Sequence, residues 1–197
     1  TSPKLGERRI RPGDEVITSS FTMPATATAI LLNGAVPVFA DISPETFCIT
    51  AESIEKCITP RTKAILSVNI FGGSPDYAPI LVLAKKHNLK IIEDNAQAPG
   101  AQYRGKFTGT IGDIGIFSFN VHKTIQAGEG GMLVTNNDRY AYRAELVRNH
   151  GEAVEDDLAL AGAKKLEYIA GSNYRLTELQ AVIMVEQLKK LEAFNKK

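Results

Sequence analysis

The sequence is poor in the residue types that bind metals or form disulfide bonds. Its 197 residues include only two cysteines and three histidines. Cys48 and Cys57 lack the spacing of a CxxC motif, and His87, His122 and His150 form no metal-ligand pattern. We therefore expect neither a disulfide bond nor a bound metal ion.

An excess of charge of one sign and long hydrophobic runs are missing too. The 23 Lys and Arg residues balance 22 Asp and Glu residues, which leaves a formal net charge of +1. This balance favours neither nucleic acid nor an anionic membrane as a partner. No segment reaches the roughly 18 consecutive apolar residues of a membrane span, and the polar start Thr1 to Asp14 has no signal-peptide core. These absences predict a cytoplasmic protein that acts on small molecules, and the missing initiator Met suggests that its N-terminus is cut.

Apolar runs rich in Val, Ile and Phe alternate with longer helix-like stretches. The predicted strands are 15–19, 37–40, 64–70, 90–93, 114–119 and 132–135; the predicted helices are 24–32, a short helix capped by Thr50, 76–87 and 139–149. Strands that are buried on both faces and joined by helices predict an α/β layered fold with a mostly parallel sheet. In such a fold, ligands bind outside the carboxyl ends of the strands.

The last quarter of the chain has a different pattern. Residues 151–171 are rich in acids, alanines and lysines, which predicts an exposed irregular segment. A final helix is predicted over 176–194. Its apolar stripe is formed by Leu179, Val182, Ile183, Val185, Leu188 and Leu191.

Two residues after predicted strands suggest a site for pyridoxal 5'-phosphate (PLP). Lys123 lies between the apolar run 113–119 and the glycine cluster 128–131, and Asp94 ends the apolar run that begins at Leu89. A buried lysine amine can hold the PLP aldehyde as a Schiff base, while a carboxylate holds the ring nitrogen protonated. Taken singly, Lys123 is better explained as a solvated loop lysine, and Asp94 is equally explained as an N-cap of the following turn.

Further residues near these two can contact the same cofactor. Gln97 lies one turn beyond Asp94 and could cover the ring or its phenolic oxygen, and Ser118 could donate its hydroxyl to the phosphate. A surface glutamine and a serine at a strand end are also common without any ligand. No G-x-G-x-x-G follows a predicted strand, which argues against a nicotinamide-binding domain.

The order of the motifs resembles the DegT/DnrJ/StrS sugar aminotransferases, a branch of the fold-type I PLP enzymes. The similar segments are Arg11–Ile17 (RPGDEVI), Asn33–Phe39 (NGAVPVF), Glu93–Gln97 (EDNAQ), Gly112–Asn120 (GDIGIFSFN) and Gly171–Glu178 (GSNYRLTE). The resemblance implies a three-layer αβα large domain with a mostly parallel mixed sheet over residues 1–197. Measured against the family, the N-terminal phosphate-binding segment and the small C-terminal domain are expected to be absent, and the chain alone to bind PLP weakly.

The same resemblance implies roles for single residues. Lys123 is implied to form the Schiff base with PLP, and Asp94 to bind the pyridine nitrogen. Gln97 is implied to lie beside the ring and Ser118 to bind the phosphate. Asn173 is implied to reach the phosphate in the neighbouring subunit, which makes the protein a homodimer.

Met23 departs from the family pattern. It stands where relatives often carry an aromatic residue that stacks on the cofactor. A methionine sulfur can still pack against a ring, so we expect weaker stacking.

The predicted function is transfer of an amino group, from glutamate, to a nucleotide-linked keto sugar in polysaccharide or glycoconjugate biosynthesis. One alternative is a sugar 3-dehydratase of the same fold, in which a histidine replaces the Schiff-base lysine. Counting back from Gly128 places Lys123, not His122, at that position and favours transamination. The other alternative is a truncated, non-catalytic relative that acts in subunit association.

Overall fold

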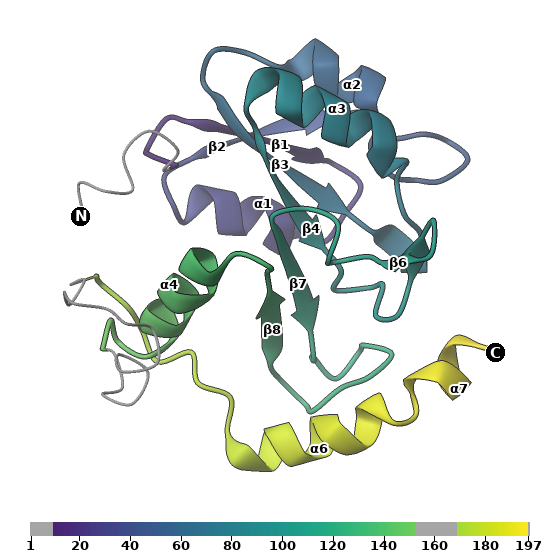
Figure 1. The fold of residues 1–197 in the computed structure, drawn as a ribbon, viewed down its shortest axis with the longest axis vertical. Coiled ribbons are helices and arrows are strands. Elements are labelled where there is room, and N and C mark those ends of the chain that lie inside the picture. The colour runs from purple at the N-terminus through teal and green to yellow at the C-terminus, as the bar shows by residue number, and fades with distance from the viewer. Residues whose placement is uncertain (1–9, 153–168, 197) are drawn as a thin grey trace.

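The computed structural model describes residues 10–152 and 169–196, and its central feature is a six-stranded sheet (Figure 1). The strand order is β2-β1-β3-β4-β7-β8, and every neighbouring pair is parallel except β7 and β8. The strands are β1 Glu15–Ser19, β2 Val36–Ala40, β3 Thr62–Val68, β4 Lys90–Asp94, β7 Ile114–Ser118 and β8 Gly131–Val134. The prediction of a mostly parallel mixed sheet is confirmed.

Helices lie on both faces of the sheet, so the fold has the predicted three αβα layers. The helices are α1 Pro24–Leu31, α2 Ala51–Cys57, the short 3-10 helix η2 Ile70–Gly72, α3 Tyr77–His87, α4 Asp138–Arg148, α6 Glu178–Leu188 and α7 Leu191–Asn195. Figure 1 shows α2 and α3 together on one side of the strands, away from α1. The alternation of side chains along each strand supplies one apolar layer to each set of helices.

Two hydrophobic clusters separate these layers. One joins strand residues to α2 and α3 and includes Ile17, Ile65 and Ile91 with Ile54, Tyr77 and Ile80. The other joins the opposite strand face to α1 and includes Val16, Ala64, Leu66 and Val68 with Ile30. Each fully buried Ile or Leu of these clusters stabilises the fold by roughly 1.5–3 kcal/mol relative to an exposed one.

Local capping residues set several helix boundaries where the sequence predicts them. Thr50 caps α2, and its side chain exchanges hydrogen bonds with Ser53 in a capping box. Asp76 caps α3 by accepting a hydrogen bond from the backbone N–H of Ala78. At the other end of α3, Asn88 adopts a left-handed conformation with φ 54°, which is a common helix stop.

The predicted final helix 176–194 is wrong in two respects. The structure divides it at Lys189 and Lys190 into α6 and α7, and α6 begins only after Thr177, whose side chain forms a capping box with Gln180. The side chain that α6 buries is that of Met184, in a small cluster with Phe119, Ile125 and Ala127. Most of the predicted apolar stripe, namely Leu179, Val182, Ile183, Val185 and Leu188, is exposed.

The structure contains a short hairpin that was not predicted from the sequence. Strands β5 Gln102–Tyr103 and β6 Lys106–Phe107 pair through a two-residue turn formed by Arg104 and Gly105. Both turn residues have positive φ, 49° and 78°, as the favoured two-residue hairpin turn requires. The predicted irregular segment 151–171 lies largely outside the described residues.

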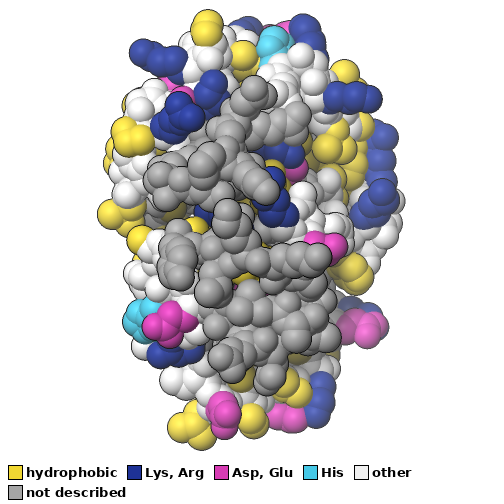
Figure 2. All heavy atoms as spheres, turned by 60° about the vertical axis from the view of Figure 1, so that its left-hand side comes forward, with side chains coloured by type: hydrophobic (Ala, Val, Ile, Leu, Met, Phe, Trp, Pro, Cys, Tyr) yellow, Lys and Arg dark blue, Asp and Glu magenta, His cyan; other side chains and the backbone are white. Residues whose placement is uncertain are grey.

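The two cysteines are free thiols; Cys48 is buried and Cys57 is partly buried. Burial raises the pKa of the Cys48 thiol. In residues 10–152 and 169–196, no three His, Cys, Asp or Glu side chains are grouped in a way that could hold a metal ion. None of the helices in these ranges combines the length and the apolar character that a membrane span needs. Figure 2 shows the basic side chains of one face at separate places, interspersed with hydrophobic and acidic ones.

Glu15 provides a test of how this fold responds to pH. Its carboxylate, only 3% exposed at the start of β1, accepts hydrogen bonds from the Thr59 hydroxyl at 2.5 Å and from Arg61 Nη2 at 2.5 Å. These contacts, led by that of Thr59, hold the pKa of Glu15 below its ordinary value of 4.5. The stabilisation is therefore complete above that value and is lost as the pH falls through the lower pKa of the folded state.

We expect Glu15→Gln to lower the free energy of unfolding at pH 7 by ~2 kcal/mol, because Arg61 and Thr59 lose a charged acceptor. The difference from wild type should shrink as the pH falls below 4.5, since protonation removes the same interaction from the wild type. Urea unfolding at several pH values measures both effects. Glu52→Gln, which removes an exposed pair with Lys56, is the control and should leave unfolding unchanged. A Glu15→Gln difference that grows in acid would contradict this account.

Candidate active site

Asp94 ends β4 at the carboxyl edge of the sheet, and its side chain is 8% exposed. Its Oδ2 accepts a hydrogen bond of 3.0 Å from the hydroxyl of Thr26 on α1, and its Oδ1 accepts one of 3.1 Å from the backbone N–H of Ala96. Each oxygen of an ionised carboxylate can accept about two hydrogen bonds. Asp94 is therefore fixed on two sides and keeps acceptor capacity for a ligand.

Met23 immediately precedes α1, the helix whose Thr26 donates a hydrogen bond to Asp94. The helix begins at Pro24, and Thr26 lies within its first turn. The Met23 side chain is 58% exposed and makes no capping hydrogen bond. The predicted role of Met23 beside the cofactor ring stays a prediction.

Ser118 faces the same layer as Asp94. In the parallel pair of β4 and β7, Asp94 is opposite Ile116, and Ser118 is two residues further along β7. Residues two apart along a strand point to the same face. The Ser118 Oγ accepts a bond of 3.3 Å from the Asn120 backbone N–H, and its own proton finds no acceptor in the described parts of the chain.

Lys123 lies in the loop that leads from β7 to β8. The loop is tied at its base, where Ala127 N–H donates to the Phe119 carbonyl at 2.9 Å, and the Lys123 N–H donates to the Asn120 carbonyl at 2.9 Å. Asn120 is held in turn by its bond of 2.8 Å to Glu129. Lys123 is half-buried, and its amine makes no hydrogen bond or ion pair with any described residue.

Gln97 is oriented by a backbone group of η2, the short helix that follows β3. Its Oε1 accepts a hydrogen bond of 3.0 Å from the N–H of Phe71. Phe71 has a positive φ of 54°, an uncommon conformation for this residue type. Because the oxygen is used in this way, the two N–H groups of the Gln97 amide are left for another acceptor.

A second, buried carboxylate, that of Glu93, lies next to Asp94 in β4. Glu93 is fully buried and accepts backbone hydrogen bonds from Gly109 at 2.7 Å, Ile111 at 2.6 Å and Gly112 at 2.6 Å. Tyr77 lies against it, and burial, followed by the negative charge of Glu93, raises the pKa of the tyrosine hydroxyl. Neither Glu93 nor Thr26 was predicted as a site residue, because their contacts join segments far apart in the sequence.

Asn173 is not brought together with the other predicted residues. It pairs with Asn149 after α4, and its Oδ1 accepts a bond of 3.3 Å from the N–H of Arg175. Arg175 also donates to the Asn149 side chain at 2.6 Å. Its predicted role in the neighbouring subunit stays a prediction.

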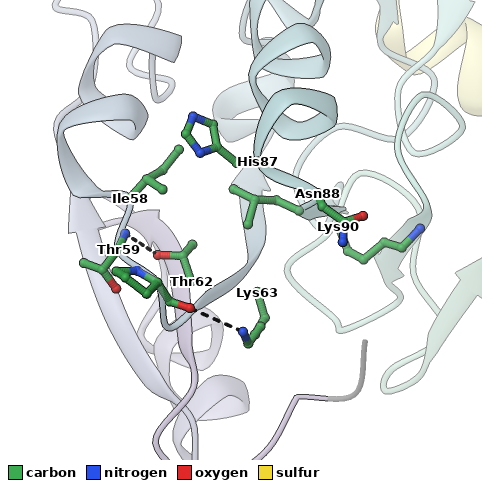
Figure 3. A pocket seen from close by; sticks show the side chains of 9 residues that line it. Ile58, Thr59, Thr62, Lys63, His87, Asn88 and Lys90 are labelled. Atoms are coloured by element: carbon green, nitrogen blue, oxygen red, sulfur yellow. Dashed lines mark hydrogen bonds between the residues drawn. The ribbon is translucent and has the colours of Figure 1, made fainter. Parts of the chain in front are cut away.

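A pocket lies at the opposite edge of the sheet (Figure 3). It has a volume of about 440 Å³ and is lined by residues at the amino ends of β3 and β4 and the end of α3, among them Lys63, His87 and Lys90. Ligands of open α/β sheets bind outside the carboxyl ends of the strands. We therefore assign the site to the edge that carries Asp94 and Ser118.

A layered α/β domain with a mostly parallel sheet is the architecture that this chain shares with solved aminotransferases. A solved aminotransferase from Psychrobacter cryohalolentis has the same fold, with a TM-score of 0.87 and 39% identity over 93% of this chain and 48% of the other. The chain belongs to the DegT/DnrJ/EryC1/StrS aminotransferase family, which matches residues 4–197. The family resemblance inferred from the motifs is confirmed.

Three curated relatives show how much of the sequence is shared, and two of them have the same identity to this chain. GDP-perosamine synthase of Caulobacter vibrioides is 44% identical over 184 residues, 93% of this chain and 47% of the relative. The UDP-N-acetyl-3-dehydro-alpha-D-glucosamine 3-aminotransferase of Acidithiobacillus ferrooxidans is 44% identical over 189 residues, 94% of this chain and 48% of the relative. The L-glutamine:2-deoxy-scyllo-inosose aminotransferase of Streptomyces kanamyceticus is 39% identical over 93% of this chain and 44% of its own length. The chain thus spans about half the length of these relatives.

We expect Glu93→Gln to loosen the support behind the site. The amide would place an N–H group against backbone donors, which should lower the free energy of unfolding by about 2–3 kcal/mol. Hydrogen exchange should speed up at the amides of Gly109, Ile111 and Gly112. Glu129→Gln is the control, because its exposed Oε1 can still accept from Asn120. Unchanged exchange at all three amides would show that Glu93 does not hold this loop.

Proposed function

We propose that the protein to which this chain belongs is a PLP-dependent aminotransferase acting on a nucleotide-linked keto sugar. The observation that carries the proposal is the meeting of Asp94 and Ser118 on one face of adjacent strand ends, followed by the unpaired amine of Lys123. A lysine and a carboxylate are the protein groups that PLP enzymes use to bind and tune the cofactor. The family membership of the chain supports the same assignment.

The donor set of the site fits PLP. Lys123 offers an unpaired amine for the aldehyde, and Asp94 offers anionic oxygens with free acceptor capacity for a protonated ring nitrogen. The unused proton of Ser118 can be donated to the phosphate, and the unused N–H groups of Gln97 to the phenolic oxygen. Met23 would cover a face of the ring with its thioether.

PLP supplies an electron sink for the carbon that loses a proton. Lys123 would bind the cofactor through its amine and, as a general base, would accept and return the proton of the donor's α-carbon. Asp94 would keep the ring nitrogen protonated and thereby keep the sink effective. The same residues would serve the transfer of the amino group to the keto sugar.

The substrates are inferred from the relatives. Two of them carry names that refer to GDP- or UDP-linked sugars, which supports a nucleotide-linked keto sugar and a role in polysaccharide or glycoconjugate synthesis. We propose glutamate as the donor. Glutamine, which appears in the name of a third relative, is the competing donor to be compared with it.

The proposed protein is cytoplasmic and a homodimer. The exposed Asn173 would then contact the phosphate bound by the neighbouring subunit. Lys123, rather than His122, is proposed to bind the cofactor, because Lys123 is the more buried of the two and His122 is exposed. This choice favours transamination over sugar dehydration.

Borohydride trapping tests the lysine directly. After incubation with PLP and reduction, we expect mass spectrometry to find the phosphopyridoxyl group on Lys123, because its amine is unpaired and next to the proposed phosphate site. Lys123→Ala should lose this label and turnover, whereas Lys106→Ala, which alters an exposed strand lysine, should keep both. Labelling spread evenly over surface lysines, or transamination by Lys123→Ala, would refute the proposal.

Asp94→Ala should separate cofactor attachment from chemistry. The lysine bond to the cofactor should still form, but the single-turnover rate with L-glutamate should fall by roughly 10³ or more because the electron sink is lost. Stopped-flow absorbance of the bound cofactor measures this rate, and L-glutamine is run in parallel. Asp41→Ala removes an exposed carboxylate and is the control. A rate for Asp94→Ala within a few-fold of the control would remove Asp94 from the mechanism.

A further inference from the structure

Two threonine hydroxyls link Asp94 to the loop before α1. Thr26 Oγ1 lies 3.0 Å from Asp94 Oδ2, and Thr22 Oγ1 lies 3.0 Å from Thr26 Oγ1. An ionised carboxylate can only accept, so the single proton of Thr26 goes to Asp94. Thr22 must then be the donor to Thr26. The direction of both hydrogen bonds is therefore fixed, from Thr22 to Thr26 to Asp94.

The environment of Thr26 makes it a rigid donor. Its side chain is 4% exposed, and it lies in the first turn of a helix whose start is fixed by Pro24. A β-branched side chain in a helix has few χ1 rotamers to choose from. A hydroxyl that receives one hydrogen bond while it donates another is also polarised, which strengthens the bond to the carboxylate.

We propose that Thr26 is a positioning residue that orients the Asp94 carboxylate toward the cofactor ring nitrogen. Thr22 links this orientation to the position of the loop that carries Met23. The inference rests on the proposed function. With Thr26 on Oδ2 and the Ala96 N–H on Oδ1, the Asp94 carboxylate has one donor on each oxygen and its rotation is fixed. Its remaining acceptor capacity can then be directed to a single ligand atom.

The coupling follows from chain connectivity. Thr22 is the residue immediately before Met23, so a shift of that loop would break the bond to Thr26 and release the Asp94 carboxylate. The loop has its own anchor, because the Phe21 N–H donates to the Ser19 hydroxyl oxygen at 2.9 Å. The same loop position would therefore set both contacts to the cofactor ring, that of Asp94 at its edge and that of Met23 on its face.

The test uses Thr26→Val, which keeps the shape and removes the hydroxyl, with Thr26→Ser as the conservative rescue. Thr28→Val is the matched control, since it makes the same change at an exposed position of the same helix. Two quantities are measured on the PLP-loaded protein: the dissociation constant for PLP, and the 15N NMR shift of ring-labelled PLP, which reports protonation of the ring nitrogen.

We expect Thr26→Val to raise the dissociation constant about tenfold, the value of one hydrogen bond to a charged acceptor, and to move the 15N shift toward the unprotonated value. Thr22→Val should cause a smaller shift in the same direction. Thr26→Ser and Thr28→Val should match the wild type. A protonated ring nitrogen that is unchanged in Thr26→Val would overturn the inference while leaving the proposed function intact. Wild-type protein with no PLP affinity or an unprotonated ring nitrogen would instead contradict the proposed function.

A cofactor-free measurement separates positioning from general stability. Urea unfolding of wild type, Thr26→Val, Asp94→Asn and the double variant forms a double-mutant cycle. If the hydroxyl acts on the carboxylate, the shifts in midpoint should be non-additive, with Thr26→Val costing less once Asp94 is neutral. Fully additive shifts would count against a direct bond between the two side chains.

Discussion

Strand β4 ends in two neighbouring carboxylates that point into opposite layers of the fold. The candidate site depends on which hydrogen-bond donors stabilise the charge of each. Glu93 faces the layer of α3, where Tyr77 lies against it, and Asp94 faces the layer of α1, where Thr26 donates to it. Burying an unpaired charge costs several kcal/mol, so neither side chain could be where it is without dedicated donors. The alternation of a β-strand thus separates a structural acid from one that is available to a ligand.

The two sets of donors differ in kind. Glu93 uses three backbone N–H groups of one loop, which leaves little capacity for anything else. That loop must pass very close to β7: a Cβ at Gly115 would lie 2.1 Å from the Gly109 carbonyl oxygen. Glycine at position 115 is therefore required for the loop to reach Glu93. Asp94, by contrast, is held by one hydroxyl and one N–H and stays open on the side of the site.

The sequence predicts those parts of the structure that depend on local pattern. The central strands, the cap of α2 and the position of Asp94 at a strand end follow from apolar runs and a capping residue within a few positions. The contact of Thr26 with Asp94 does not, because it joins residues 68 positions apart and exists only once α1 packs on the sheet. The last helix was predicted from its apolar residues alone, which could not reveal that α6 buries Met184 and leaves Leu179 and Leu188 exposed.

The antiparallel pairing of β7 with β8 also bears on the order in which the fold assembles. Ser118 pairs with Gly131 across a single loop, whereas a parallel pair such as β1 and β2 needs a helical crossover between Glu15 and Val36. The entropy lost on closing a loop grows with its length, so the β7–β8 hairpin is the least costly pair of the sheet to nucleate. The loop that carries Lys123 can consequently organise early during folding, and Asp94 at the end of β4 joins it once the slower crossover connections have closed.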